Sequence, residues 1–393
     1  MNTTSQQIRA YRGPALFSYG FRPFFLFGAL WAALAVTLWL PFLSGSIELP
    51  TGLPPLSWHV HELVYGFVPA IIAGFLLTAV PNWTGRLPVV GKPLAALFAL
   101  WLAGRAAVLM SAYLGMTVAA IIDAAFLLAL GGLIGREIIA AANHRNLRVL
   151  AVVAILWAGN VMFHAEAILD TGTGYGTRTG VAAVILLISL VGGRIIPSFT
   201  RNWLVQKRQK ELPAPFDRFD MLAMGVTAVA LLSWIVAPSA ALTATLSIAA
   251  SGINAARLIR WRGHTTAAEP LVLILHAGFA FIPIGFLLLG ISIMMPGVVA
   301  PAGALHGWTA GAIGIMTLAV MTRASLGHTG QPLTATRAIQ FIYLCAVIAA
   351  LARVGAAAFL FRDTMLIVSA AAWVAAFGGF CIVYGPLLLK PRT

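Results

Sequence analysis

Long apolar stretches recur along the whole sequence, and they limit the possible folds of this chain more than any other feature. A helix needs about 20 apolar residues to cross the hydrocarbon core of a bilayer, and segments of that length follow one another with short polar breaks between them. Hydrophobic residues make up 60% of the chain and charged residues only 9%, which cannot supply the solvated surface of a water-soluble domain. The sequence therefore predicts an all-α polytopic membrane protein.

About twelve such segments can be counted, and we expect them to form a single transmembrane domain over residues 1–393. The expected helices are 24–42, 60–80, 93–111, 114–134, 147–169, 180–197, 219–236, 239–258, 269–291, 303–321, 338–359 and 365–389. The seventh and eighth are separated only by the region around Pro238.

The basic residues are concentrated in alternate loops. Most of the 25 Lys and Arg residues lie at the two ends of the chain or in every second loop, whereas the opposite loops hold Arg178 and Arg362. By the positive-inside rule, both termini are expected in the cytoplasm. A nucleic-acid partner is not expected despite the net charge of +14, because nucleic-acid-binding domains gather their cations into one patch.

A faint internal repeat links the second and tenth expected helices. Residues 61–85 can be overlaid on residues 306–330, which pairs His61 with His306 and Gly66 with Gly311. The sixth expected helix ends at Ser198–Thr200, a segment similar to the ends of the two overlaid segments. Helices 2, 6 and 10 would then be equivalent members of three four-helix units.

The eight histidines differ in their expected depth. On the expected topology, four lie near the outer ends of helices, namely His59, His61, His164 and His306, while His276 lies in the inner half of helix 9 and His328 just beyond the inner end of helix 10. Neutral imidazole is the usual protein ligand of haem iron and copper. We therefore take His59, His61, His164, His276 and His306 as candidate metal ligands, against the alternative that they cap helix ends or hydrogen-bond carbonyls at the membrane interface.

His61 and His306 are the expected axial ligands of haem, whether of one haem or of two, because they occupy matching positions in the repeat. The chain has no CxxCH motif, so a non-covalent haem b is expected. His59 and His61 lie on different sides of a helix unless His59 belongs to the preceding loop, so they would serve two sites.

Small residues recur every four positions near both histidines, as Gly66, Ala70 and Gly74 and as Gly303, Gly307 and Gly311. Such ridges are typical of close helix packing in membranes. They would also allow a flat porphyrin to lie against the backbone.

Several ionisable residues fall inside expected helices, where they are costly unless paired or hydrated. Arg105 and Arg353 would pair with haem propionates, or alternatively with Glu62 or Glu166. Glu62 and Glu166 lie within three residues of candidate ligands and are the candidate catalytic residues, as relays of the protons that reduction takes up. Asp123, at the expected middle of its helix, either continues such a path or bonds to a neighbouring hydroxyl.

Five segments resemble the hallmark segments of the NnrS family, in the same order and over nearly the whole chain. They are Phe21–Phe25, Trp58–Glu62, Gly74–Gly85, Gly192–Thr200 and Met321–Gly330. The resemblance implies a twelve-helix inner-membrane protein with haem and copper, associated with denitrification and with resistance to nitric oxide. A weaker architectural likeness is to the catalytic subunit of haem-copper oxidases and nitric oxide reductases, which has twelve helices, cytoplasmic termini and metal ligands on helices 2 and 10. Fold analogy of that kind does not establish function.

Three functions are compatible with these features. The first is a redox enzyme that binds nitric oxide at a haem or copper centre and reduces or otherwise removes it with electrons from a donor. The second is a haem protein that senses or holds nitric oxide or dinitrosyl-iron species without turnover. The third is a secondary transporter, although its critical polar groups should cluster at the membrane midplane on broken helices.

Overall fold

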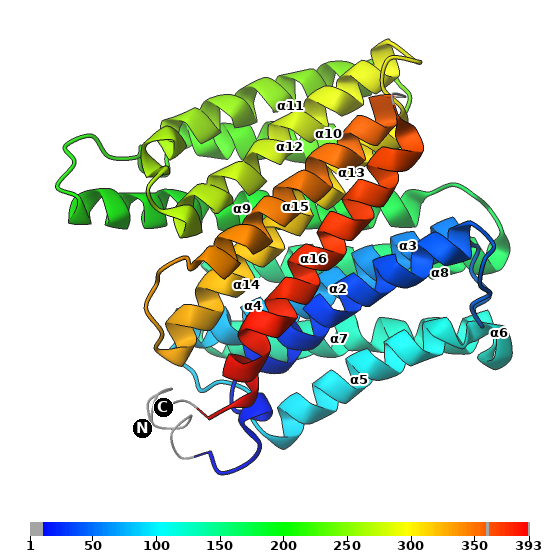
Figure 1. The fold of residues 1–393 in the computed structure, drawn as a ribbon, viewed down its shortest axis with the longest axis horizontal. Helices are drawn as coiled ribbons and strands as arrows, with labels where there is room; N and C mark the ends of the chain where they lie inside the picture. Colours follow the sequence, from blue (N-terminus) through cyan, green and yellow to red (C-terminus); the bar gives the residue numbers. More distant parts are fainter. Residues whose placement is uncertain (1–10, 359–360, 392–393) are drawn as a thin grey trace. The chain divides into compact units, whose positions relative to one another are not determined.

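In the computed structural model, which describes residues 11–358 and 361–391, all regular structure of those residues is helical (Figure 1). Twelve helices of the described residues are long and apolar enough to cross a membrane, which confirms the expected fold. They are α2 (Phe21–Leu43), the combined α3, η2 and α4 (Pro55–Thr84), α5 (Lys92–Leu109), α7 (Met116–Ala140), α8 (Leu147–Leu169), α9 (Tyr175–Gln206), α10 (Arg218–Val236), α11 (Ala241–Arg260), α12 (Pro270–Met294), the combined α13, η5 and α14 (Pro301–Thr329), α15 (Arg337–Gly355) and α16 (Arg362–Leu389).

The expected boundaries are least accurate where a helix continues beyond its apolar core. α9 has 32 residues instead of the expected 180–197. At 1.5 Å per residue it is about 48 Å long, which exceeds the ~30 Å hydrocarbon core. The tenth span continues to Thr329, so His328 lies in the last turn of α14 and not beyond the helix as expected. The expected end of the eleventh span at Phe359 lies outside the described residues.

Proline and glycine set the ends of the second span. Pro55 occupies the first turn of α3, where its missing N–H costs no helical hydrogen bond. Gly85 ends α4 with a left-handed φ of 68°, and its N–H donates to the carbonyl of Pro81. A residue with a side chain would be strained at that φ, so the glycine fixes where the helix stops.

The chain divides into two compact units. Unit 1 comprises residues up to 183 together with 324–331 and the segment from 377 onward, and unit 2 comprises 184–323 and 332–376. In unit 1, α7 packs against both α5 and α8, and α2 packs against α4. In unit 2, α11 packs against both α10 and α12, and α15 packs against α13 and η5.

The second and tenth spans have the same internal construction. α3 (Pro55–His61) is followed by a π-helix, η2 (Glu62–Phe67), and then by α4 (Val68–Thr84). α13 (Pro301–His306) is followed by a π-helix, η5 (Gly307–Ile313), and then by α14 (Gly314–Thr329). In both spans a histidine immediately precedes the π-helix and a glycine with positive φ, Gly85 or Gly330, follows the last residue. α9, the sixth span, is an unbroken helix through Ser198–Thr200. The shared construction therefore links the second and tenth spans but not the sixth.

The two ridges of small residues serve helix packing. In unit 1, a Cβ atom added to Gly74 would lie 2.6 Å from the Phe25 ring, and one added to Gly66 would lie 2.4 Å from Nη1 of Arg105. In unit 2, a Cβ atom on Gly311 would lie 2.3 Å from the Phe281 ring. Of the two interpretations of these ridges, the contacts of the glycines support close packing.

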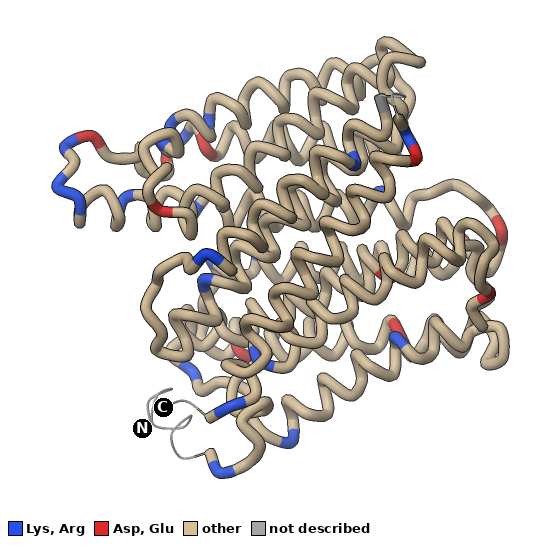
Figure 2. Tube along the Cα trace, viewed as in Figure 1, with Lys and Arg blue, Asp and Glu red and all other residues tan. Residues whose placement is uncertain are grey.

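The start of the first span and the end of the last span meet. The guanidinium of Arg22, in the first turn of α2, donates to the carbonyls of Leu388 (3.0 Å) and Lys390 (2.6 Å) at the end of α16. These carbonyls have no partner within the helix, so the arginine satisfies them. Within unit 1, Lys and Arg residues gather at this same end of the helices (Figure 2). With twelve candidate spans among the described residues, the start of α2 and the end of α16 are expected on the same side of a membrane.

Candidate metal centre

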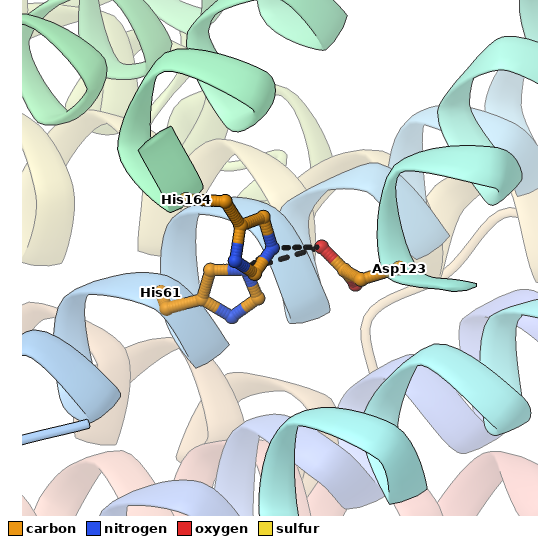
Figure 3. Close-up of side chains that lie close together, drawn as sticks. All are labelled: His61, Asp123 and His164. Atoms are coloured by element: carbon orange, nitrogen blue, oxygen red, sulfur yellow. Dashed lines mark hydrogen bonds and ion pairs between the residues drawn. The ribbon is translucent and has the colours of Figure 1, made fainter. Parts of the chain in front are cut away.

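Three helices of unit 1 bring two histidines and an aspartate together in the protein interior. His61 is the last residue of α3, Asp123 lies about two turns into α7, and His164 lies in the last turns of α8 (Figure 3). The three residues are 0%, 2% and 3% exposed. One ligand atom from each of them lies within 4.8 Å of the other two, so these residues could hold a metal ion.

The three ligand atoms form a nearly equilateral triangle. Nε2 of His61 lies 3.1 Å from Nε2 of His164 and 3.1 Å from Oδ2 of Asp123. Nε2 of His164 lies 3.0 Å from the same carboxylate oxygen. The side-chain amide of Asn160, on α8, donates to Oδ2 of Asp123 at 2.8 Å and so helps to orient the carboxylate.

A second layer of side chains orients this group. Nδ1 of His61 lies 3.1 Å from Oε1 of Glu62, which can only accept, so Nδ1 carries the hydrogen. In the neutral ring this leaves Nε2 of His61 with its lone pair directed toward Asp123 and His164. A histidine that donates one ring N–H to a carboxylate and offers the other nitrogen is the usual arrangement of a metal ligand.

Arg105, on α5, connects the two acids. Its Nη1 donates to Oε2 of Glu62 at 2.6 Å and its Nη2 pairs with Oδ1 of Asp123. The indole N–H of Trp31, on α2, donates to the same oxygen of Glu62 at 2.7 Å. The arginine is 3% exposed, so these are buried charge-assisted contacts that leave little freedom to either carboxylate.

Two glycines permit the close approach that this network needs. A Cβ atom on Gly66, in the π-helix η2, would lie 2.4 Å from Nη1 of Arg105, so the guanidinium lies directly against the backbone there. A Cβ atom on Gly104 would lie 3.0 Å from Oδ1 of Asp123, so α5 and α7 touch at this level. The carbonyl of Gly66 accepts the indole N–H of Trp101 at 2.9 Å.

When both imidazoles are neutral, as metal ligands must be, the charges of the five side chains Glu62, Asp123, Arg105, His61 and His164 do not cancel. Glu62 and Asp123 contribute two negative charges, Arg105 contributes one positive charge, and neutral imidazoles contribute none. A buried excess of negative charge is costly in a low-dielectric interior. A bound cation would offset that cost.

Glu166, the second candidate catalytic acid, has different surroundings. Its carboxylate accepts the backbone N–H groups of Tyr175 (2.6 Å) and Gly176 (3.2 Å) and the hydroxyl of Thr173 (2.5 Å). It therefore closes the turn that joins α8 to α9. The side chain is half-buried, unlike the fully buried Glu62.

The other candidate histidines have partners of different kinds. His59 stacks on Trp39 with ring centroids 3.9 Å apart, so it and His61 have separate surroundings although both belong to α3. His276, on α12, bonds through Nε2 to the hydroxyl of Thr200 at 2.8 Å. His306 belongs to unit 2 and is half-buried, and its Nδ1 donates to the carbonyl of Ala302 at 2.6 Å. α15, which carries Arg353, packs against the α13 helix that carries His306.

Two features of the structure escaped the sequence reasoning. Asp123 is expected to continue a proton path or to bond to a neighbouring hydroxyl, but its carboxylate faces His61 and His164 from the N-terminal third of α7. Arg257 lies within the expected helix 239–258 but is not among the ionisable residues singled out there; it is fully buried in α11, and its Nε donates to Asp220 at 2.7 Å. The signal for Asp123 was its acidity inside an apolar segment, and Arg257 had no comparable signal because it lies next to a basic loop.

The comparisons with known proteins agree with the segments noted in the sequence. No curated protein and no solved structure matches the chain. The family model described as NnrS protein matches residues 15–392, which is nearly the whole chain. This multi-pass membrane protein therefore belongs to the NnrS family.

Proposed function

We propose that the protein binds a redox metal at His61, His164 and Asp123 and that it binds nitric oxide there and reduces or otherwise detoxifies it. The observation that carries the proposal is the buried convergence of the three ligand atoms within 4.8 Å of one another. The resemblance to NnrS proteins supplies the link to nitric oxide. Reduction would draw on an electron donor in or beside the bacterial cytoplasmic membrane.

The donor set suits this chemistry. Imidazole and carboxylate bind iron and copper, and both metals change oxidation state in biology. The negative charge of the five-residue group favours cation binding. Nitric oxide is small and uncharged, so it can reach a centre surrounded by membrane helices without an aqueous channel.

A haem b, which the family resemblance implies, is proposed at His306. Donation from Nδ1 of His306 to the Ala302 carbonyl leaves Nε2 with its lone pair, as an axial ligand requires. Arg353, on the helix packed against α13, is the proposed partner of a propionate. His59 and His276 stay candidate ligands of copper or of a second haem.

The test is an optical and EPR spectrum of the detergent-purified full chain with metal analysis, recorded oxidised, reduced and after addition of nitric oxide. We expect non-haem metal that His164→Ala removes, and a haem spectrum that His306→Ala removes or alters. His264→Ala, in the loop between α11 and α12, should change neither. A metal-free, colourless preparation from haem- and metal-replete cells would contradict the proposal and favour the transporter.

Turnover separates the enzyme from a sensor or protective protein. With an artificial reductant present, the enzyme should consume nitric oxide continuously in an electrode assay. A protein that holds nitric oxide without turnover should consume at most a stoichiometric amount. Loss of continuous consumption in His164→Ala would assign the reaction to this centre.

A further inference from the structure

The positions of the ligand atoms carry an inference about the kind of centre. We infer that His61, His164 and Asp123 form a non-haem site, in which a single divalent ion takes all three on one face and keeps the opposite face for exogenous ligands. This inference rests on the metal binding proposed above. It assigns His61 to a mononuclear ion and not to a haem.

The first argument is the spacing of the three ligand atoms. With metal–ligand bonds of about 2.1 Å, adjacent ligands of an octahedral centre are about 3.0 Å apart, and those of a tetrahedral centre about 3.4 Å. The three sides of the observed triangle measure 3.1, 3.1 and 3.0 Å. The donors therefore match one triangular face of an octahedron, and two histidines with one carboxylate on such a face are typical of non-haem ferrous sites.

The second argument is that the same spacing excludes His61 and His164 as the two axial ligands of one haem. Imidazoles on opposite faces of a haem would hold their nitrogens about 4 Å apart, which is twice a bond of about 2.0 Å. The nitrogens of His61 and His164 are 3.1 Å apart, which suits adjacent positions. On a haem iron, the positions adjacent to an axial ligand are taken by the porphyrin nitrogens, so Asp123 and His164 would occupy the space of the macrocycle.

The third argument is the character and charge of the donors. The group offers nitrogen and oxygen atoms and no sulfur, which selects a divalent ion such as Fe²⁺ over Cu⁺. A divalent ion would convert the excess negative charge of the five side chains into a single positive charge. The contacts of Glu62 and Arg105 fix the orientation of His61 and Asp123, and three protein ligands leave the other positions of an octahedral ion for exogenous ligands.

The inference is tested by measuring haem and non-haem metal separately in the purified full chain. His164→Ala and Asp123→Asn should each lose the non-haem ion and retain the haem content of the wild type. Glu166→Gln is the matched control, because Glu166 follows His164 by two positions but closes a turn. Loss of haem in His61→Ala or His164→Ala, with no loss of non-haem metal, would overturn the inference.

Reconstitution of the metal-depleted protein with Co²⁺ tests the coordination geometry directly. The weak visible absorption of six-coordinate Co²⁺ is expected, and the intense bands of a tetrahedral site would contradict it. Failure of the proposed function has a different signature. If the ion binds as described but nitric oxide leaves its EPR spectrum unchanged, then the coordination stands and the role in nitric oxide chemistry does not.

Discussion

Nδ1 of His61 lies 3.1 Å from Oε1 of Glu62, the next residue in the sequence, at the junction where α3 becomes a π-helix. Neighbouring residues on a regular helix point in different directions, so this contact depends on how the two side chains bend toward each other at the junction. π-Helical insertions often occur at functional sites. Here the junction places the imidazole of His61, a candidate metal ligand, against the carboxylate of Glu62 that orients it.

Removing the charge of the Glu62 carboxylate should weaken metal binding. Glu62→Gln keeps an oxygen that can accept from Nδ1 of His61 but loses the ion pair with Arg105. Outer-layer changes of this kind typically cost about 10–100-fold in metal affinity, and we expect a loss in that range by competition with a chelator. Glu166→Gln should bind metal like the wild type. Equal affinity in the two variants would show that Glu62 does not orient the site.

Replacing Arg105 should destabilise the protein strongly. Arg105→Met leaves Glu62 and Asp123 buried without their shared guanidinium, and breaking a buried ion pair costs about 3–5 kcal/mol. The measurement is the free energy of unfolding in detergent or the thermal midpoint. Arg86→Met is the control, because Arg86 is 45% exposed and its pair with Glu137 should contribute about 0–1 kcal/mol. A loss no larger than that of the control would contradict the role given to Arg105.

A single added methyl group should displace Arg105. In Gly66→Ala the new Cβ atom would lie 2.4 Å from Nη1 of Arg105, so the guanidinium must move away from Glu62. We expect a loss of about 1–3 kcal/mol in stability, as for other overpacked cores, together with weaker metal binding. Gly252→Ala, on α11, has nothing within 4 Å of its new Cβ and should leave both unchanged or improve stability. Wild-type metal affinity in Gly66→Ala would show that the guanidinium position is unimportant.

Arg22 should stabilise the end of the last span. Arg22→Met removes the donors to the carbonyls of Leu388 and Lys390, and a hydrogen bond to a charged group contributes about 1.5–3 kcal/mol. Amide hydrogen exchange should become faster in residues 387–390, with little change in α7 or α8. Arg148→Met, at an exposed position at the start of α8, is the control. Unchanged exchange at the end of α16 would mean that water replaces the arginine without cost.

The number of spans could be predicted because length and apolarity alone decide whether a helix can cross a bilayer. The ends of α9 and α14 could not be predicted, because a helix that extends beyond the hydrocarbon core contains no run of apolar residues there. Shared depth could be inferred for His61 and His164 from the order of the spans. The convergence of the two imidazoles could not be inferred, because it depends on how α3 and α8 are rotated about their own axes and on how both pack against α7. The contacts of Asp123 could not be predicted either, because they depend on the same packing of α7 between α5 and α8.

The repeat shows a different limit. The overlay of residues 61–85 on 306–330 anticipated two equivalent spans, and the structure adds a π-helix after the histidine in each. No residue preference distinguishes a π-helix from an α-helix in the sequence alone. The small residues near each histidine allow two interpretations, and the contacts of Gly66 and Gly311 support close helix packing.

X-ray absorption spectroscopy of the purified protein tests the central claim most directly, because it reports the ligands of each metal separately. At the edge of the non-haem metal, the account predicts a first shell of nitrogen and oxygen at about 2.0–2.2 Å with the outer scattering of imidazole. His164→Ala should diminish that imidazole contribution, and Glu166→Gln should not. A spectrum from porphyrin-bound iron alone, or a first shell unchanged by His164→Ala, would contradict the account.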